Sequence, residues 1–352
     1  MNKLPTTLIL ALLIFGGISQ RSQYSAIVSQ INNMNNTWTA GLSTDINYDD
    51  ESQLKSKLGA ILNFVPPPAS EATPSDASNG QTTNVVIPTP TRPRNLQAIT
   101  PSIYPNSLDL RVKFPKCQSI SLIRNQLNCG SCWAFATMNA LSDRYCIAKS
   151  TPTVVAQKFF SVDDVLSCCQ KCNGGSGNGC RGGMTYFAYV HAQTIGVVSG
   201  ETLSYNGFCK PYFLELNPSL GMRPAACTSV CTNPVTYSPA YPLDKFKTKG
   251  TTFNRGEGPM IAALNNGGSI SVSFMVFQDF YAYKGGIYIN LTGRALGGHA
   301  VRLVGYGVEN GVKFWICANS WGVFWGEKGF FRIRRGTNEC GIESNFFVAA
   351  TV

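Results

Sequence analysis

The sequence predicts an α+β protein in which a helical lobe is followed by a β-rich lobe, with a separate segment in front of both. Three observations support this fold class. Residues 132–148 are apolar nearly all round, which is typical of a helix buried in a core. Residues 269–277, 299–308 and 312–319 are strand-like runs separated by glycines. Residues 66–101 are rich in proline, serine and threonine, which indicates an extended linker.

The first residues indicate export. Lys3 precedes an apolar run at residues 8–15, and the small residues Gly17 and Ser19 follow, so we expect a signal peptide over residues 1–19. A membrane anchor is the alternative, but the apolar run is shorter than the roughly 20 residues that a transmembrane helix needs. We therefore expect the chain to enter the secretory pathway and to keep no membrane span once the signal is removed.

A leader and a main domain follow the signal. Apolar residues recur at helical spacing over residues 24–34 and again over residues 54–62, which predicts two modest helices. The linker comes next, and we place the precursor boundary near its end, at about Ile103. The predicted organisation is a propeptide over residues 20–102 and a mature domain over residues 103–352.

Cysteine and charge change at the same boundary. All thirteen cysteines lie between Cys117 and Cys340, as expected for an exported domain held by disulfides. An odd number leaves at least one thiol free. Residues 1–102 contain six basic and six acidic residues, so the remainder carries the whole formal charge of +10. We interpret this charge as a solvated basic surface, because no nucleic-acid motif accompanies it.

Residues 126–135, Gln-Leu-Asn-Cys-Gly-Ser-Cys-Trp-Ala-Phe, contain a candidate thiol nucleophile. Cys132 stands at the predicted start of the buried helix, where free N–H groups and the helix dipole favour a thiolate. Gln126 lies six residues earlier, and its amide together with the Cys132 N–H is placed to donate to the oxyanion of a tetrahedral intermediate.

A thiol nucleophile needs an imidazole partner, and the chain has only His191 and His299. Asn310-Gly311 between two strand-like runs predicts a two-residue hairpin turn. In that register His299 lies opposite Gly322 and Asn319 lies opposite Arg302, so His299 and Asn319 share one end of the hairpin. A bulge would bring them closer. We expect Asn319 to hold the His299 ring, whereas His191 is expected to be an ordinary buried histidine in a helix.

The competing interpretation of Cys129-Gly-Ser-Cys132 is a redox dithiol, or half of a zinc site completed by Cys169 and Cys172. That interpretation leaves Gln126 and the hairpin unexplained. Secretion also favours disulfides over zinc thiolates.

From about Tyr104 to its end the chain resembles the papain-like cysteine peptidases, whose signature is Cys-Gly-[Ser/Ala]-Cys-[Trp/Tyr]. Gln126, Cys132, His299 in Gly-Gly-His-Ala and Asn319 in Ala-Asn-Ser-Trp-Gly match the functional positions of the family. His299 and Asn319 lie 167 and 187 residues after Cys132, beyond the usual 130–150, which indicates an insertion.

Within the family the motifs are most similar to those of cathepsin B: residues 161–169, 307–311 and 340–344, and Trp-Thr-Ala-Gly at residues 38–41 of the leader. The resemblance implies the papain-like two-lobe fold, with a helical left lobe and a β-barrel-like right lobe. It also implies five disulfides, which leave Cys132, Cys317 and Cys340 free: Cys117–Cys146, Cys129–Cys180, Cys168–Cys227, Cys169–Cys172 and Cys209–Cys231.

Two departures from cathepsin B concern specificity. Its occluding loop carries a histidine pair that captures the substrate's C-terminal carboxylate, whereas residues 210–226 here are fewer and contain no histidine, which predicts mainly endopeptidase action. The glutamate that accepts arginine in its second specificity pocket is replaced by Asn345, which predicts a preference for neutral or hydrophobic side chains. Thr185 and Ser273 are expected as further pocket walls.

The resemblance assigns the remaining roles and partners. Gly182 and Gly183 are expected to pair with the substrate backbone, and Trp321 is expected to shield the bond between Asn319 and His299. The implied partners are protein and peptide substrates, the chain's own propeptide as inhibitor and cystatin-type inhibitors. We expect a monomer without cofactor, metal or nucleic-acid partner, in a lysosome-like acidic compartment or outside the cell. A catalytically silent secreted relative that acts as a matrix or binding protein is the alternative.

Overall fold

The computed structural model describes residues 19–62 and 104–352, apart from 176–177, 202–206, 217–223 and 236. The apolar run of the predicted signal peptide and the predicted boundary near Ile103 lie outside the described residues. We refer to residues 19–62 as the leader segment. No helix in the described part of the chain is long and apolar enough to cross a membrane.

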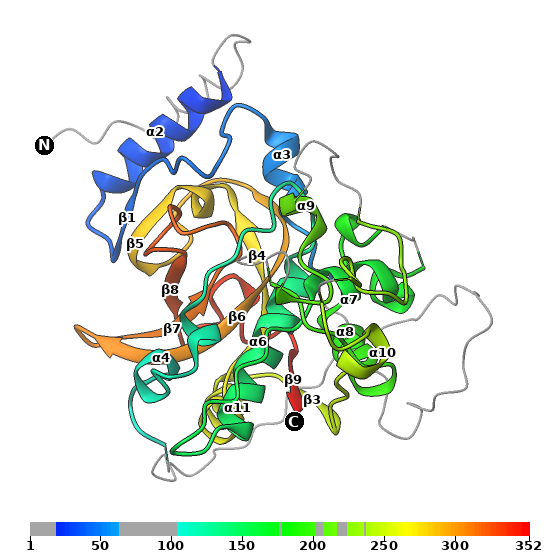
Figure 1. Ribbon diagram of the computed structural model, residues 1–352. Coiled ribbons are helices and arrows are strands. Elements are labelled where there is room, and N and C mark those ends of the chain that lie inside the picture. The colour runs from blue at the N-terminus through cyan, green and yellow to red at the C-terminus, as the bar shows by residue number, and fades with distance from the viewer. Residues whose placement is uncertain (1–18, 63–103, 176–177, 202–206, 217–223, 236) are drawn as a thin grey trace, which may run out of the picture.

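The long helix α6 (Cys132–Lys149) lies at the centre of the molecule, between the other helices and the sheet (Figure 1). Thirteen of its eighteen residues are buried, so the prediction of a helix apolar all round is confirmed. Helix α7 (Val162–Cys168) begins as expected, because Ser161 Oγ accepts from Asp164 N at 2.9 Å. The other helical elements of this domain are α4 (Leu110–Lys113), α5 (Gln118–Ser121), η2 (Gln170–Asn173), η3 (Gly179–Arg181), α8 (Thr185–Thr194), α9 (Phe213–Leu216), α10 (Tyr241–Asp244), α11 (Glu257–Gly267), η6 (Gln278–Ala282) and η7 (Glu339–Gly341).

The described strands form one mixed sheet in the order β1-β5-β8-β7-β6-β4-β9-β3, with β2 paired to β6 beside this path. The fold class is confirmed, although the path runs from β1 to β3 without closing into a barrel. The strands are β1 (Trp38–Ala40), β2 (Leu108–Asp109), β3 (Gly250–Asn254), β4 (Ile270–Phe277), β5 (Tyr283–Tyr288), β6 (Ala295–Glu309), β7 (Val312–Ala318), β8 (Phe330–Arg334) and β9 (Phe347–Thr351).

The hairpin of β6 and β7 turns where the sequence predicts, with Glu309 opposite Val312 and both turn residues at positive φ. The register predicted beyond the turn is wrong by one residue. Leu303 pairs with Cys317 and Gly305 pairs with Ile316, so a bulge in β6 contains one extra residue. Arg302 therefore lies opposite Ala318 and not opposite Asn319.

The leader segment packs on the β lobe and then enters the main domain. Helix α2 (Gln20–Asn32) buries Tyr24 and Ile31, and β1 pairs with β5 at the edge of the sheet (Figure 1). Helix α3 (Glu51–Ser56) ends before the sequence pattern predicts. Residues 58–62 are not helical, because Gly59, Ala60 and Ile61 bond to backbone groups of the main domain.

The structure contains five disulfides, which are the five pairs that the resemblance implies. Cys132, Cys317 and Cys340 are free. Cys129 bonds to Cys180, and Cys169 bonds to Cys172. A redox dithiol of Cys129 with Cys132, or a zinc site made from both pairs, is therefore contradicted.

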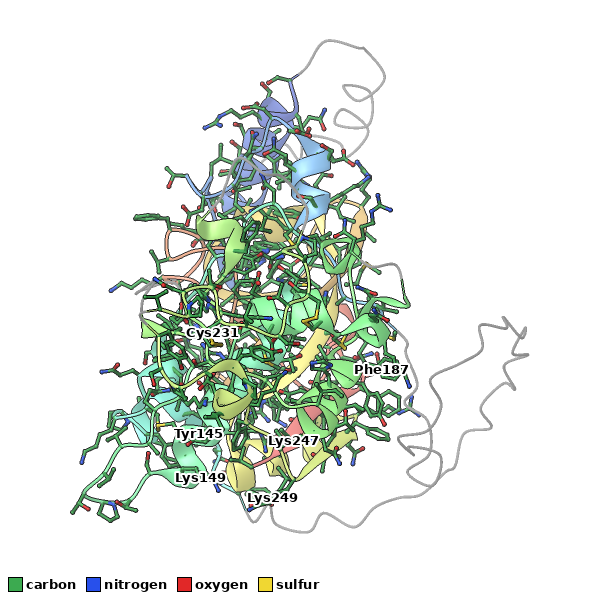
Figure 2. The ribbon with its side chains drawn as sticks, turned by 45° about the vertical axis from the view of Figure 1, so that its right-hand side comes forward. Tyr145, Lys149, Phe187, Cys231, Lys247 and Lys249 are labelled. Atoms are coloured by element: carbon green, nitrogen blue, oxygen red, sulfur yellow. A yellow bond between two sulfur atoms is a disulfide. The ribbon has the colours of Figure 1, made fainter. Side chains whose placement is uncertain are left out.

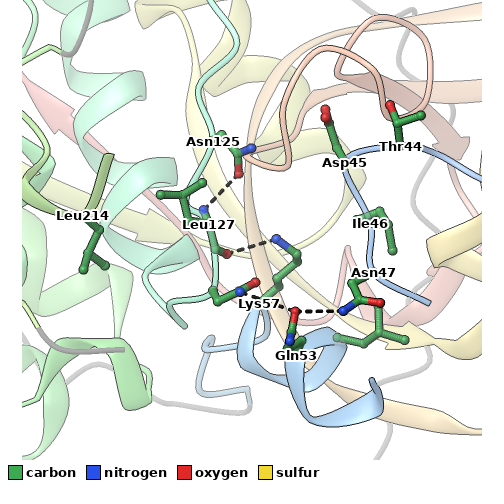
Figure 3. Close-up of a pocket in the computed structure, with 11 residues that line it drawn as sticks. Thr44, Asp45, Ile46, Asn47, Gln53, Lys57, Asn125, Leu127 and Leu214 are labelled. Carbon is green, nitrogen blue, oxygen red and sulfur yellow. Dashed lines mark hydrogen bonds between the residues drawn. The ribbon is translucent and has the colours of Figure 1, made fainter. Parts of the chain in front are cut away.

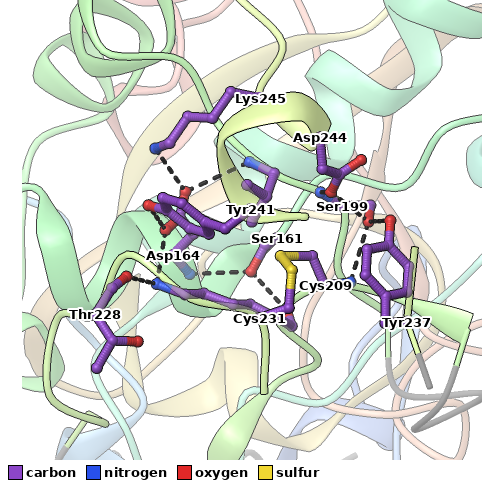
Figure 4. The surroundings of a disulfide bond; sticks show 12 residues. Ser161, Asp164, Ser199, Cys209, Thr228, Cys231, Tyr237, Tyr241, Asp244 and Lys245 are labelled. Carbon is purple, nitrogen blue, oxygen red and sulfur yellow. Dashed lines mark hydrogen bonds and ion pairs between the residues drawn. A yellow bond between two sulfur atoms is a disulfide. The ribbon is translucent and has the colours of Figure 1, made fainter. Parts of the chain in front are cut away.

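A buried carboxylate holds the segment around the Cys209–Cys231 disulfide (Figure 4). Asp164 on α7 receives Lys210 Nζ at 3.0 Å, Tyr241 Oη at 2.8 Å and Lys245 Nζ at 3.3 Å. Lys210 Nζ also donates to Thr228 O at 2.6 Å. Both ends of the shortened loop at residues 210–226 are thus fixed to the helical lobe by charge-assisted hydrogen bonds.

Part of the positive charge of the main domain lies at the end opposite the leader helices. Figure 2 shows Lys149, Lys247 and Lys249 at this end of the molecule, and all three side chains are exposed. The arrangement is consistent with a solvated basic surface.

Candidate active site

Cys132 is the first residue of α6 and is completely buried. The loop before it is fixed by the Cys129–Cys180 disulfide and by Gly130 N, which donates to Cys180 O at 2.8 Å. Backbone groups of Ala300 on β6 and of Gly59 in the leader segment lie against the thiol. The thiol therefore sits between the helical lobe, the sheet and the leader segment.

His299 and Asn319 lie together, one strand apart. His299 Nε2 is 2.8 Å from Asn319 Oδ1, and the same oxygen accepts from Ser320 N at 2.8 Å. His299 precedes Ala300, which contacts the Cys132 thiol, and among the described atoms its Nδ1 has no hydrogen-bond partner. This geometry leaves Nδ1 available to a nucleophile while Asn319 fixes the ring.

Trp321 covers this pair. Its ring centroid lies 4.8 Å from that of His299, with the planes tilted by 36°, and its side chain is fully buried. It stacks on Tyr281 at 4.7 Å and belongs to an aromatic cluster with Phe280 and Trp325. His299 and Asn319 are themselves almost completely buried.

Gln126 is buried beside the thiol, and its side chain is oriented by three contacts. Oε1 accepts from Ser320 Oγ at 2.6 Å, which directs Nε2 the other way. Nε2 donates to Cys129 O at 2.7 Å and to Lys57 O of the leader segment at 3.0 Å. Gln126 Nε2 therefore already donates a hydrogen bond to a carbonyl oxygen of the leader segment, as a donor to an oxyanion must do.

The leader segment crosses the site through close backbone contacts. Gly183 N donates to Gly59 O at 2.8 Å, Ile61 N donates to Gly183 O at 3.3 Å, and Ala60 N donates to Gly298 O at 3.1 Å. A Cβ on Gly59 would lie 1.9 Å from Gly130 O, and one on Gly298 would lie 2.1 Å from Ala60 O. Glycine at these positions is therefore what lets a polypeptide lie flat in the cleft.

Burial of the site sets its protonation. It raises the pKa of the Cys132 thiol to about 11 and lowers the pKa of His299 to about 4. It also lowers the pKa of Lys57, which is almost completely buried, to about 8. Between pH 4 and 11 the covered site therefore holds a neutral thiol and a neutral imidazole, and the reactive ion pair is absent.

The structure places the expected pocket residues on separate elements. Thr185 is the first residue of α8, and Ser273 on β4 pairs with Ala300, next to His299. Asn345 is buried in the loop after η7, where its Nδ2 donates to Gly341 O at 2.9 Å. Gly182 approaches Gly59 O, which would lie 2.9 Å from an added Cβ.

Sequence reasoning missed three parts of the site. Gly298 O accepts from Ala60 N of the leader segment, and the Gly-Gly pair before His299 was the available signal for it. Lys57 of the leader segment accepts from Gln126 Nε2 through its carbonyl oxygen. Leu127 adopts the left-handed conformation with φ 57° next to Gln126. No sequence pattern predicts that conformation for leucine. Among the described residues no group of histidine, cysteine and carboxylate side chains is arranged to hold a metal.

This arrangement of thiol, oriented imidazole and amide donor defines a thiol hydrolase. A family model described as papain family cysteine protease matches residues 104–350, and the chain belongs to that family. It is 41% identical over 258 residues to "Cathepsin B-like cysteine proteinase 4" of Caenorhabditis elegans, an alignment that covers 70% of this chain and 75% of the relative. The "Gut-specific cysteine proteinase" of the same organism is 40% identical over 252 residues, covering 70% and 74%.

Solved structures agree with this assignment. Procathepsin B S9 from Trypanosoma congolense matches with a TM-score of 0.68 and 29% identity, covering 93% of this chain and 97% of that structure. Procathepsin L 3 from Tenebrio molitor larval midgut shares the fold at 18% identity and a TM-score of 0.63. The predicted resemblance to cathepsin B-like cysteine peptidases is confirmed, and the chain is a cysteine peptidase.

Proposed function

We propose that the chain hydrolyses internal peptide bonds of proteins through Cys132 and His299. The observation that carries this proposal is the 2.8 Å contact of His299 Nε2 with Asn319 Oδ1, beside a thiol at the start of α6. Asn319 fixes the ring so that Nδ1 takes the proton of Cys132. The helix N-terminus stabilises the resulting thiolate.

The reaction proceeds in two steps. The Cys132 thiolate attacks the carbonyl carbon, and the oxyanion receives hydrogen bonds from Gln126 Nε2 and the Cys132 N–H. His299 then protonates the leaving amine, which leaves a thioester on Cys132. His299 next activates a water molecule that hydrolyses the thioester and restores the thiol.

We also propose that the leader segment belongs to a removable propeptide, over residues 20–102, whose departure from residues 103–352 opens the cleft. The backbone contacts of residues 59–61 with Gly183 and Gly298 support this, because Gly183 is also the residue expected to pair with the substrate backbone. The signal over residues 1–19 and the lysosomal, vacuolar or extracellular destination belong to the same proposal. We also propose that the enzyme acts on protein and peptide substrates, is inhibited by cystatin-type proteins and is a monomer.

Acid is expected to loosen the leader segment. A covered His299 with a pKa of about 4 binds fewer protons than an open one near 6.5, so the closed state loses stability as the pH falls from 6.5 towards 4. The loss is at most about 1.4 kcal/mol per pH unit. Hydrogen exchange of residues 19–62 in the unprocessed Cys132→Ala chain, compared at pH 7 and pH 4.5 after correction for intrinsic rates, measures it.

The matched variants separate His299 from the other groups that titrate in this window. His191 has its pKa lowered to about 4 by burial as well, and it lies in α8. Introducing His299→Gln into the Cys132→Ala chain should flatten the pH dependence by more than introducing His191→Gln. A pH dependence that survives His299→Gln unchanged would refute this mechanism of acid release.

The cleavage mode follows from residues 210–226, which contain no histidine to bind a substrate's C-terminal carboxylate. We expect internal cleavage of a protein substrate to be faster than release of dipeptides from C-termini. Mass spectrometry of the products of a denatured protein, followed over time, measures both. Dominant dipeptide release at early times would overturn the proposed mode and leave the thiol mechanism in place.

Asn345 is proposed to line the pocket for the residue before the one at the scissile bond, together with Thr185 and Ser273. An amide there favours neutral side chains over arginine. Asn345→Glu is expected to raise the ratio of kcat/KM for arginine over leucine at this substrate position by about tenfold, since a carboxylate would pair with the guanidinium. Asn345→Gln is the neutral control, and an unchanged ratio in Asn345→Glu would remove Asn345 from the pocket.

The alternative of a catalytically silent binding protein predicts loss of one of the reacting groups. Gln126, Cys132, His299 and Asn319 are all present, and His299 Nε2 lies 2.8 Å from Asn319 Oδ1, which favours the peptidase. Hydrolysis of a hydrophobic-arginine dipeptide amide by the acid-activated protein tests the proposed function.

A further inference from the structure

A cavity of about 340 Å³ lies between the leader segment and the main domain (Figure 3). Along the leader segment, residues 59–61 contact Gly183, Lys57 O contacts Gln126, and residues 53 and 54 line the cavity, so the cavity lies beyond Gln126 from Gly183. Its main-domain wall consists of Asn125, Leu127, Asn128 and Leu214. Gly182 and Gly183 are expected to pair with the substrate backbone, and we assign to them the residues before the scissile bond. The residues after that bond must therefore leave the cleft over this wall.

Leu127 is held in a conformation that leucine rarely adopts. Its φ is 57°, and its backbone is fixed on both sides, since its N–H donates to Asn125 Oδ1 at 2.9 Å and its carbonyl accepts from Lys57 Nζ at 3.1 Å. A left-handed leucine costs free energy that a glycine would not. Such strain persists where the side chain or the backbone serves the site. In this conformation Leu127 lines the cavity.

Leu214 approaches the same cavity from α9, which is tethered directly behind the oxyanion donor. Tyr212 Oη donates to Gln126 O at 3.0 Å and lies 3.1 Å from Ser131 Oγ. Phe213 N donates to Asp163 Oδ1 at 3.3 Å. These bonds hold the start of α9 against Gln126 and α7, and Leu214 is 3% exposed, so Leu214 is a fixed part of the wall.

Of the seven leader residues that line the cavity, five are polar or charged: Thr44, Asp45, Asn47, Gln53 and Lys57. The leader side chains that line the cavity include the buried Ile46 and Leu54, and the stem of Lys57 lies beside Gln126. The described main-domain residues that line the cavity carry no charge; they supply two leucines and two asparagines. A large apolar side chain buries more surface against this wall than alanine does, whereas a carboxylate finds no cation on it.

We propose that Leu127 and Leu214 form the subsite for the residues that follow the scissile bond, and that this subsite selects large apolar side chains. The inference rests on the proposed peptidase function and adds a specificity for the leaving half of the substrate. It requires no cofactor and no change in the chemical steps.

Internally quenched peptides that differ only in the two residues after the scissile bond test the proposal. The ratio of kcat/KM for leucine over alanine at these positions is the readout, measured on protein that is expressed as the full chain and then acid-activated. Leu127→Gly is expected to lower this ratio about fivefold, because burial of a leucine side chain contributes up to a few kcal/mol. Glycine tolerates a φ of 57°, so this variant is expected to fold.

Leu214→Ala is the second variant and is expected to lower the same ratio. Leu243→Ala, at a leucine that is 78% exposed, is the matched control and should leave the ratio unchanged. Each variant is also assayed on a dipeptide amide, which has no residue after the scissile bond and so corrects for general losses. An unchanged ratio in both Leu127→Gly and Leu214→Ala, with the amide still hydrolysed, overturns the subsite alone. Failure of the wild type to hydrolyse either kind of substrate overturns the proposed function and the subsite together.

Discussion

Replacing Cys132 with alanine is expected to lower kcat/KM for a hydrophobic-arginine dipeptide amide by about 10³-fold or more. The substitution removes the atom that forms the thioester, and the oxyanion donors that remain supply only a residual rate. Folding should be preserved, because the wild-type thiol has no partner in a disulfide and alanine is a small apolar residue. Acid treatment followed by progress curves at several substrate concentrations measures the effect.

Cys340→Ala is the matched control, since Cys340 is also a free thiol but lies outside the cleft, in η7. It should keep nearly all activity. Activity that survives Cys132→Ala, or that disappears with Cys340→Ala alone, would contradict the assignment of the nucleophile.

Asp143→Ala is expected to lower the free energy of unfolding by about 3–5 kcal/mol. Arg302 Nη1 donates to both oxygens of Asp143 at 2.9 Å, and Ser269 Oγ donates to Oδ2 at 2.6 Å. Both charged side chains are at most 2% exposed, so removing the carboxylate leaves an uncompensated buried guanidinium. Chemical denaturation followed by tryptophan fluorescence measures the loss.

The two residues of this ion pair also lie close in sequence to the reacting groups. Asp143 lies on α6, eleven residues after Cys132, and Arg302 lies on β6, three residues after His299. The pair thus joins the two elements that carry the reacting groups. Lys313→Ala is the control, because the ion pair of Lys313 with Glu257 at 3.8 Å is largely exposed and should contribute less than about 1 kcal/mol. Equal stability of the two variants would refute the role of the buried pair.

Local sequence chemistry predicts the turns, caps and helix burial of this fold well. Asn310-Gly311 specifies its turn, and Ser161 specifies the start of α7, because in each case the deciding contacts lie within a few residues. The sequence does not predict the position of the bulge in β6, because that position depends on how β6 packs between two neighbouring strands. The register at Arg302 was wrong for that reason.

Tertiary contacts also override the pattern at residues 58–62. Leu58, Ile61 and Leu62 continue a helical spacing from Leu54, yet the helix ends at Ser56. Backbone bonds from Gly59, Ala60 and Ile61 to the main domain replace those of a helix. Those partners lie more than 100 residues away in sequence, so no local propensity predicts the change.

Some residues of the candidate site are also predicted from local sequence, whereas others depend on tertiary contacts. The motif around Cys132 and the hairpin carrying His299 predict the reacting groups, because the chemistry needs those residue types. The left-handed conformation of Leu127 and the burial of Lys57 arise only when the leader segment and the main domain come together. The subsite proposed for the substrate residues after the scissile bond therefore depends on these tertiary contacts and not on a sequence motif.

Stoichiometric labelling of the acid-activated protein with a thiol-directed alkylating reagent at pH 5.5, followed by peptide mapping, tests the central claim most directly. A thiolate paired with an imidazolium reacts at this pH, whereas an ordinary thiol does not. We predict one equivalent of label, on Cys132, with complete loss of peptidase activity and no label on Cys317 or Cys340. Complete inactivation with the label on another cysteine, or full activity with Cys132 alkylated, would contradict the account.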